Sequence, residues 1–285
     1  NAGLNLSTGA NNTFIGGAVG DANTTADNNT AVGYNSLGVN TTGANNVALG
    51  AYSLDSNTTA SDNTAIGMGA LGLNTTGANN VAVGRGALDS NTTASDNTGV
   101  GKNALYANTD GDKHVAVGAN ALDANTTGNS NTACGYEALT ANTTGTNNTA
   151  VGRGALSANT TAQDNTTLGV FAGQNTTTGS FNTAIGRIAL QTNTTGAGNV
   201  AVGYAALLGN TTASNNTAVG RVCLEVNTTG ANNTAVGSNA LTLNTTASNN
   251  TAVGKNALAA NTTGHQNVAL GFEALDANTT GSNNT

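Results

Sequence analysis

Six of the seven basic residues in this chain are separated from one another by multiples of 17 residues. Long basic and aromatic side chains repeated in this way could hold an acidic glycan, because aromatic rings stack and guanidinium groups pair with carboxylate or sulfate. We predict a ligand-binding stripe made of Arg85, Lys102, Arg153, Arg187, Arg221, Lys255, Tyr34, Tyr136 and Tyr204, with Met68 and Phe272 at the same spacing.

A second interpretation gives the stripe no ligand. Acidic residues recur four positions further on, as in Asp89 after Arg85 and Glu225 after Arg221. Such residues would simply pair, and long side chains at an edge would shield the fold or an interface. Both interpretations stay open at the level of sequence.

The other chemically reactive side chains are sparse. His114 and His265 lie far apart in sequence, and no Ser/His/Asp set, carboxylate pair or phosphate loop recurs. Cys134 and Cys223 are predicted to be small apolar fillers without a disulfide. We therefore expect no enzyme activity, no metal and no cofactor.

The spacing of 17 belongs to a repeat that covers nearly the whole chain. With Asn11 as position 1, sixteen repeats run without insertion over 11–282. Position 6 is Gly in all sixteen, position 10 is Leu in fourteen, and position 13 is Asn in fifteen. Position 5 is aliphatic except at Cys134. Invariant Gly indicates a positive φ or close backbone packing.

The repeat predicts an all-β fold, a parallel β-solenoid with 17 residues per coil and about 16 coils. "NTAVG" reads as a short strand that ends at a Gly turn, and "NTTGA" or "NTTAS" as a corner. Identical positions would stack about 4.8 Å apart, which gives roughly 75–80 Å in all. We assign positions 3 and 5 to the interior, and predict a side-chain amide ladder at position 13.

One exchange between repeats predicts an interface. In the first repeat position 4 is Phe14 where most repeats have Ala, and position 10 is Gly20 where most have Leu. The two positions therefore share a space. With position 4 facing outward, that space lies between chains, and the chain is expected to form a homo-oligomer, most simply a trimer.

The composition argues against several classes of function. Only 7% of the 285 residues are charged, with a net charge of −7, so a nucleic-acid partner is not expected. The sequence lacks an apolar run of about 18 residues, so we expect no membrane contact by this segment. Residues 1–285 are predicted to form a single continuous array, a segment of a longer fibre without caps, because the sequence begins and ends in mid-repeat.

The phrases "NNTAVG", "NTAIG" and "NVAVG" resemble the repeats of trimeric autotransporter adhesin heads. The wording "NTTG-NNTAVG--AL" is still more similar to 17-residue arrays of phage tail fibres and bacterial surface fibres. The resemblance covers essentially the whole chain. It implies a left-handed β-roll, assembly as a trimer or filament, and a place outside the cell, on the cell surface or on a virion.

The expected function is therefore structural: the rigid shaft or head of an extracellular fibre or adhesin, for reach, display and multivalent attachment, with cell-surface glycans as possible ligands. The alternative is an ice-binding or glycan-binding solenoid that uses a Thr/Asn file or the basic and aromatic stripe. Adjacent Thr residues in "NTT" face opposite ways in an extended segment, which leaves one Thr file rather than two. "NTT" is also a formal glycosylation sequon, which its turn role explains.

Overall fold

The computed structural model describes residues 2–285 and confirms a parallel β-solenoid with 17 residues per coil. The chain divides into two compact units, which meet in sequence between Thr144 and Gly145. Each unit is a stack of coils, and each coil contributes one three-residue strand at positions 3–5. The handedness of the coils stays a prediction.

Eight strands belong to each unit within residues 2–285. In unit 1 they are β1 (Thr13–Ile15), β2 (Thr30–Val32), β3 (Val47–Leu49), β4 (Thr64–Ile66), β5 (Val81–Val83), β6 (Thr98–Val100), β7 (Val115–Val117) and β8 (Thr132–Cys134). In unit 2 they are β9 (Thr149–Val151), β10 (Thr166–Leu168), β11 (Thr183–Ile185), β12 (Val200–Val202), β13 (Thr217–Val219), β14 (Thr234–Val236), β15 (Thr251–Val253) and β16 (Val268–Leu270).

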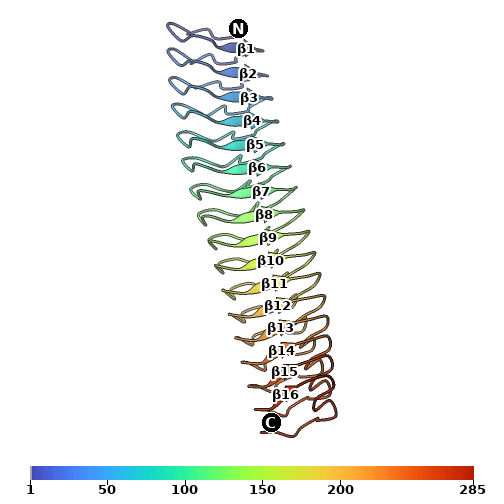
Figure 1. Cartoon of the computed structure of the whole chain (residues 1–285). Coiled ribbons are helices and arrows are strands. Elements are labelled where there is room, and N and C mark those ends of the chain that lie inside the picture. The colour runs from blue at the N-terminus through green and yellow to red at the C-terminus, as the bar shows by residue number, and fades with distance from the viewer. Residues whose placement is uncertain (1) are drawn as a thin grey trace. The chain divides into compact units, whose positions relative to one another are not determined.

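Each strand pairs in parallel with the strand of the next coil, in a register set by the 17-residue period. Thr30 lies beside Val47 in unit 1, and Val200 lies beside Thr217 in unit 2. Within each unit the strands follow one another in chain order, as Figure 1 shows. Every position therefore forms a row of its own copies along the unit.

Close backbone contact between coils explains the invariant Gly at position 6. Gly84 has a φ of +134°, and a Cβ placed there would lie 2.5 Å from the carbonyl oxygen of Gly101 in the next coil. Positions 1, 8 and 10 also take positive φ, and the Leu residues at position 10 are among them, for example Leu88 with φ 54°. This conformation costs most residues roughly 1–2 kcal/mol, which the repeated contacts between coils must offset.

The prediction that positions 3 and 5 face the interior is wrong. Position 4 is the buried one: Ala31, Ala82 and Ala201 are fully buried. Position 5 faces outward in both units, with Ile66 at 37% exposure and Leu168 at 48%. Side chains alternate between the two faces of the strand, as predicted, but the face that lies inside carries position 4 and not positions 3 and 5.

Where position 10 is Leu, the interior leaves little space for the strand; Thr167, a branched residue at position 4, is buried in the one described repeat beyond the first that has Gly, at Gly173, in place of Leu. Elsewhere the interior is filled by Leu at position 10, with a small residue at position 9 and Ala at position 4. At Gly99, a position-4 residue, an added Cβ would lie 3.3 Å from Cδ1 of Leu88. Position 4 thus packs directly on the Leu row, which leaves space for one methyl group.

The exchange of Phe14 and Gly20 has the same cause. A Cβ at Gly20 would lie 2.7 Å from Cζ of Phe14, so the two positions share one space, as predicted. That space lies inside the coil and not at an interface between chains. The exchange therefore gives no support to oligomerisation.

The predicted amide ladder at position 13 is confirmed. Nδ2 of Asn57 donates to Oδ1 of Asn40 at 2.9 Å, and Nδ2 of Asn74 donates to Oδ1 of Asn57 at 3.0 Å. The same row in unit 2 contains Thr176, and the bond from Asn193 to its hydroxyl oxygen is 3.4 Å long. Apart from the break at Thr176, these fully buried amides satisfy one another along the stack.

A second ladder runs along position 2. The backbone N–H of Asn46 donates to Oδ1 of Asn29 at 2.9 Å, and Nδ2 of Asn46 donates to the carbonyl of Ala60 at 3.0 Å. Each position-2 side chain therefore ties one coil to the next and the strand to the corner. Two polar rows, rather than a large apolar core, hold the interior together.

Candidate functional site

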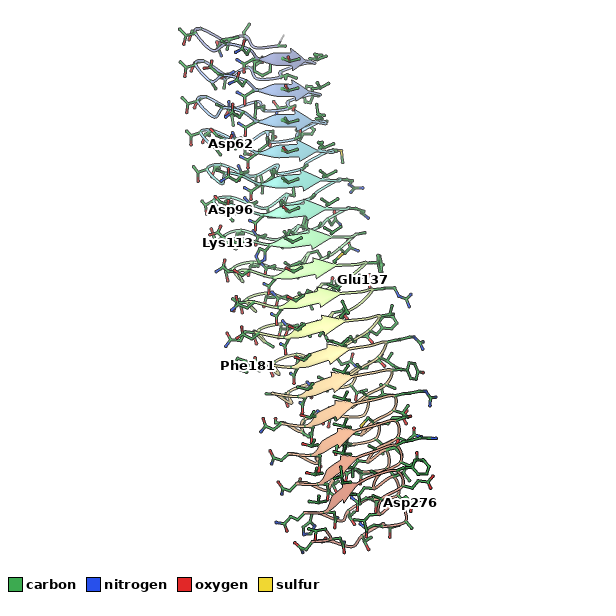
Figure 2. The ribbon with its side chains drawn as sticks, viewed as in Figure 1. Asp62, Asp96, Lys113, Glu137, Phe181 and Asp276 are labelled. Atoms are coloured by element: carbon green, nitrogen blue, oxygen red, sulfur yellow. The ribbon has the colours of Figure 1, made fainter. Side chains whose placement is uncertain are left out.

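Position 7, the predicted stripe, lies on the surface in both units. Its basic side chains are exposed, and so are Tyr34, Tyr136 and Tyr204. The adjoining row at position 8 lies on the side of the strands opposite to position 1: Figure 2 shows Glu137 from position 8 on one side and Asp62, Asp96 and Lys113 from position 1 on the other.

In unit 2 the stripe is a ladder of cation–π contacts between neighbouring coils. The guanidinium carbons of Arg187 and Arg221 lie 5.8 and 6.0 Å from the ring centroid of Tyr204. Nζ of Lys255 lies 5.8 Å from the ring centroid of Phe272. Arg153 is closest, at 4.6 Å from the ring centroid of Phe171, which is a position-8 residue of the next coil. These cations are already occupied by aromatic side chains of the same unit.

In unit 1 the stripe is more open. Tyr34 packs edge-on against Tyr52, with ring centroids 5.5 Å apart. Tyr136 is exposed, and a hydrogen bond with Glu137 raises the pKa of its hydroxyl. Arg85 and Lys102 are exposed, and neither has an aromatic ring over it among the described residues.

The predicted pairing of Arg85 with Asp89, and of Arg221 with Glu225, does not occur. No ion pair of 4.0 Å or less joins either couple in residues 2–285. Instead, burial raises the pKa of Asp55, and burial followed by the charge of Asp55 raises the pKa of Asp89. The carboxylates of Asp55 and Asp89, both at position 11, are therefore close enough for the charge of one to affect the other.

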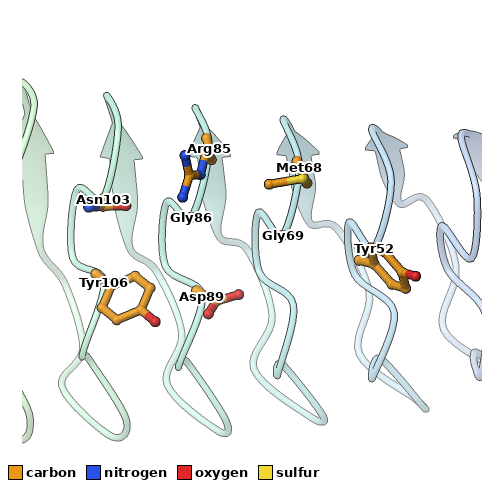
Figure 3. Close-up of a pocket in the computed structure, with 8 residues that line it drawn as sticks. All are labelled: Tyr52, Met68, Gly69, Arg85, Gly86, Asp89, Asn103 and Tyr106. Carbon is orange, nitrogen blue, oxygen red and sulfur yellow. The ribbon is translucent and has the colours of Figure 1, made fainter.

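A hollow of about 290 Å³ opens in unit 1 beside Arg85. Its floor is formed by Gly69 and Gly86, which occupy position 8 in two successive coils. Tyr52 and Asn103 hold position 8 in the coils on either side (Figure 3). We call this site the Gly-floored hollow.

Side chains from positions 7 and 11 complete the Gly-floored hollow. Met68 and Arg85 border it on one side, and Asp89 and Tyr106 on the other (Figure 3). The carboxylate of Asp89 lies over the floor, because a Cβ at Gly69 would be 3.3 Å from its Oδ1. The hollow therefore brings an amide, a guanidinium and a carboxylate together with two aromatic rings.

Sequence reasoning placed Arg85 and Met68 at the stripe spacing and named Asp89 as a partner of Arg85, but it missed the position-8 residues and Tyr106. The signal lies in the columns of the repeat rather than along the chain. Position 8 reads Tyr52, Gly69, Gly86, Asn103 in four successive coils, and position 11 contains Gly72 beside Asp89. Where positions 8 and 11 are glycine in neighbouring coils, no side chain covers the surface there, and a hollow remains.

The two histidines do not converge on a site. His114 replaces Asn in the position-2 row and is fully buried. Its Nε2 bonds the carbonyl of Gly128 at 2.6 Å, and its Nδ1 accepts the N–H of Asn131 at 3.1 Å. Burial lowers the pKa of this imidazole. His265 lies on the surface, 3.3 Å from the hydroxyl of Ser282.

The two cysteines are free thiols in different environments. Cys223 is a buried filler, as predicted, and burial raises the pKa of its thiol to about 12. Cys134 occupies position 5 and is exposed, so the prediction that it fills the interior is wrong. It shares the outward direction of the whole position-5 row.

The "NTT" corner exposes one file of Thr, as predicted. At position 14, Oγ1 of Thr41 donates to the carbonyl of Thr58 at 3.0 Å, and the same bond recurs in later coils. Thr42 and its copies at position 15 are exposed. Asn40 and its asparagine copies at position 13 are buried in every coil except the last, where Asn278 is half-buried. The sequon asparagine is therefore inaccessible in the buried corners.

Two surveys of residues 2–285 give negative results. No three His, Cys, Asp or Glu side chains lie close enough to hold a metal ion, and no helix is long and apolar enough to cross a membrane. Comparison with known proteins finds no family model that matches the chain and no curated protein with significant similarity.

Proposed function

We propose that this chain is part of the shaft or head of an extracellular fibre, an adhesin or tail fibre that provides reach and display. The observation that supports it is the repetition of one set of contacts between all neighbouring coils within each unit. Parallel backbone bonds, the position-2 row and the position-13 row each tie a coil to the next. A load along a unit is thereby shared among many equivalent bonds.

Pulling the chain by its two ends in an optical trap tests the mechanical part of this proposal. A stack of equivalent coils should unravel in steps of one coil or a small multiple of it. One coil of 17 residues releases about 56–61 Å of extended chain. Extension without such steps at low force contradicts a load-bearing role.

Immunogold labelling tests the location. Antibodies raised against residues 1–285 should decorate filaments outside intact cells or on virions of the source. Label confined to the interior of permeabilised cells contradicts the proposal.

We infer that the partner in such a fibre is a second and third copy of the chain. The outward sheet face supports this: its position-5 row is aliphatic except for Cys134, and its position-3 row is Thr or Val, without charge. Exposed apolar faces of this kind mark interaction surfaces. An identical chain is the partner whose side chains match the same period from coil to coil.

Light scattering tests the assembly directly. The trimer requires a particle of three times 27.6 kDa. Replacing Ile66 and Val83 by Lys on the outward row should release monomers that keep their β-sheet circular dichroism, and the wild type running as a stable monomer would contradict assembly.

A further inference from the structure

We infer that the Gly-floored hollow of unit 1 binds one neutral pyranose ring of a glycan. Tyr52 and Asn103 stand three coils apart along position 8, which is about 14 Å at the spacing of parallel strands. The volume of about 290 Å³ is at the small end of ligand sites and suits a single ring. This site adds an activity to the structural role proposed above and does not depend on it.

The apolar side of the hollow fits the C–H face of a sugar. Tyr106 is 44% exposed, and its ring borders the floor, since a Cβ at Gly86 would lie 3.5 Å from its Cδ2. Tyr52 and Met68 are 46% and 52% exposed at the other end. Gly69 is half-buried and Gly86 is buried in the floor, so the floor carries no side chain of its own. The exposed rings and the thioether around it provide a surface on which a pyranose can stack.

The polar side fits the hydroxyl groups. A sugar hydroxyl donates one hydrogen bond and accepts others, so neighbouring hydroxyls match a carboxylate acceptor beside guanidinium and amide donors. Asp89, Arg85 and Asn103 supply this set around one space (Figure 3). Arg85 and Asp89 are not joined by an ion pair of 4.0 Å or less, so both retain capacity for a ligand.

The local charge selects a neutral sugar over an acidic one. Arg85 contributes one positive charge, and Asp89 faces it with Asp55 close enough to affect its titration. A uronate or sulfate in the hollow would therefore meet the carboxylate of Asp89 as well as the guanidinium of Arg85, so its charge gains little there. The Arg85 charge likewise disfavours a cationic ligand. The sequence pattern predicts that the stripe binds an acidic glycan along its length. At the Gly-floored hollow, we expect a single neutral sugar ring instead.

Saturation-transfer NMR on the whole chain, residues 1–285, tests the inference. The probes are methyl α-glucopyranoside, methyl β-galactopyranoside and methyl α-mannopyranoside, with methyl β-glucuronide as the acidic comparison. At least one neutral glycoside should bind with a Kd on the order of 1 mM, as expected for a small shallow site. The glucuronide should bind at least about tenfold more weakly.

Asn103→Phe is the sharpest variant, because Phe171 already occupies the equivalent position in unit 2 and covers Gly154. It should fill the hollow and abolish the signal. Asp89→Asn should weaken binding about tenfold, by loss of a charged acceptor. Phe181→Ala, which removes a 60% exposed aromatic side chain at position 1, outside both the hollow and the stripe, is the matched control and should bind as the wild type does.

Three results would overturn the inference: no neutral glycoside binds, the signal survives Asn103→Phe, or the glucuronide binds more tightly than every neutral probe. If Asn103→Phe does not fold, Tyr106→Ala reports instead, since it removes only a half-exposed ring. Wild-type binding in Tyr106→Ala and Asp89→Asn together would also overturn it. The pulling and labelling experiments report the structural role separately.

Discussion

Arg85 in unit 1 and Arg153 in unit 2 belong to the same six-residue sequence, VGRGAL, and yet they lie in different surfaces. In unit 2, Phe171 from the next coil covers Gly154, with its Cδ1 2.7 Å from where a Cβ would stand, and Arg153 lies over the ring. In unit 1, the equivalent residue is Asn103, and Gly86 beside Arg85 is buried under this smaller amide and the edge of Tyr106, next to the Gly-floored hollow.

In a solenoid, the side chains that cover a residue come largely from adjoining coils. The residue that separates the two environments is 18 positions away, in the next coil: Asn103 for Arg85 and Phe171 for Arg153. Identical local sequence therefore fixes the backbone, while the adjoining repeat fixes the surface. Substitutions can test each half of this statement, from the backbone that both units share to the contacts that separate them.

The largest effect is expected where the units do not differ. Gly84→Ala and Gly152→Ala each place a Cβ 2.5 Å from a glycine carbonyl oxygen of the following coil, at a φ of +134° and +133°. Backbone strain and overpacking each cost about 1–3 kcal/mol. Urea unfolding should show a loss of about 2–6 kcal/mol in both variants. A large loss in one unit alone would break the equivalence of the two backbones.

Much of the fold was predictable from the columns of the repeat. The invariant glycine predicted the tight turn, and the recurring asparagine predicted the position-13 ladder, because both demands recur in every coil. The failure concerned which face of the strand is buried. Position 5 varies among Val, Ile, Leu and Cys, whereas position 4 is Ala in thirteen repeats. Constancy of size, rather than hydrophobicity, marks the interior of so narrow a coil.

The candidate site was less predictable. The stripe was correctly placed as a row, but the partners of its cations come from neighbouring coils, as with Tyr204 between Arg187 and Arg221. Which acid pairs with which base depends on side-chain reach that column alignment does not give. The absence of an Arg85–Asp89 ion pair within residues 2–285 illustrates this limit.

The second largest effect is a dependence of stability on pH, which we expect to be larger in unit 1 than in unit 2. His114 stands in unit 1 where every position-2 residue of unit 2 from Asn148 onward is Asn. Its Nδ1 accepts the N–H of Asn131, its Nε2 faces the carbonyl of Gly128 and Nδ2 of Asn125, and Asp112 is the nearby charge. Protonation would set an N–H against an N–H, at a cost of about 1–3 kcal/mol for an unsatisfied buried donor.

The sign follows from the lowered pKa of His114. The unfolded chain binds the proton more readily than the folded chain, so the contribution to stability is complete above the ordinary histidine pKa of 6.5 and declines as the pH falls below it. Hydrogen exchange between about pH 7 and pH 5 should show the coil of His114 opening more often at the lower pH, with unit 2 changing less. His114→Asn should remove the difference. Equal responses of both units in the wild type would refute the assignment.

A third, smaller effect compares the glycines beside the two arginines. In Gly154→Ala the new methyl meets the Phe171 ring at 2.7 Å, whereas in Gly86→Ala it meets the side-chain oxygen of Asn103 at 2.9 Å. Both have similar φ, +62° and +66°, so backbone strain cancels. The half-buried amide of Asn103 can move aside more easily than a packed ring. Thermal unfolding should give Gly154→Ala a free energy of unfolding about 1–2 kcal/mol lower than that of Gly86→Ala. The reverse order would contradict the account of the two surfaces.

The smallest effect concerns the arginines themselves. Arg153→Ser removes a guanidinium 4.6 Å from the Phe171 ring and should cost about 0.5–1 kcal/mol, the value of an exposed cation–π contact. Arg85→Ser removes an exposed side chain without such a ring and should stay within about 0.5 kcal/mol. A double-mutant cycle of Arg153→Ser with Phe171→Asn isolates the pair, because Phe171→Asn recreates the residue that unit 1 has at this place. The coupling energy should account for most of the Arg153 effect. Zero coupling would mean that Arg153 merely covers the ring, and the two arginines would then differ in neighbours but not in energy.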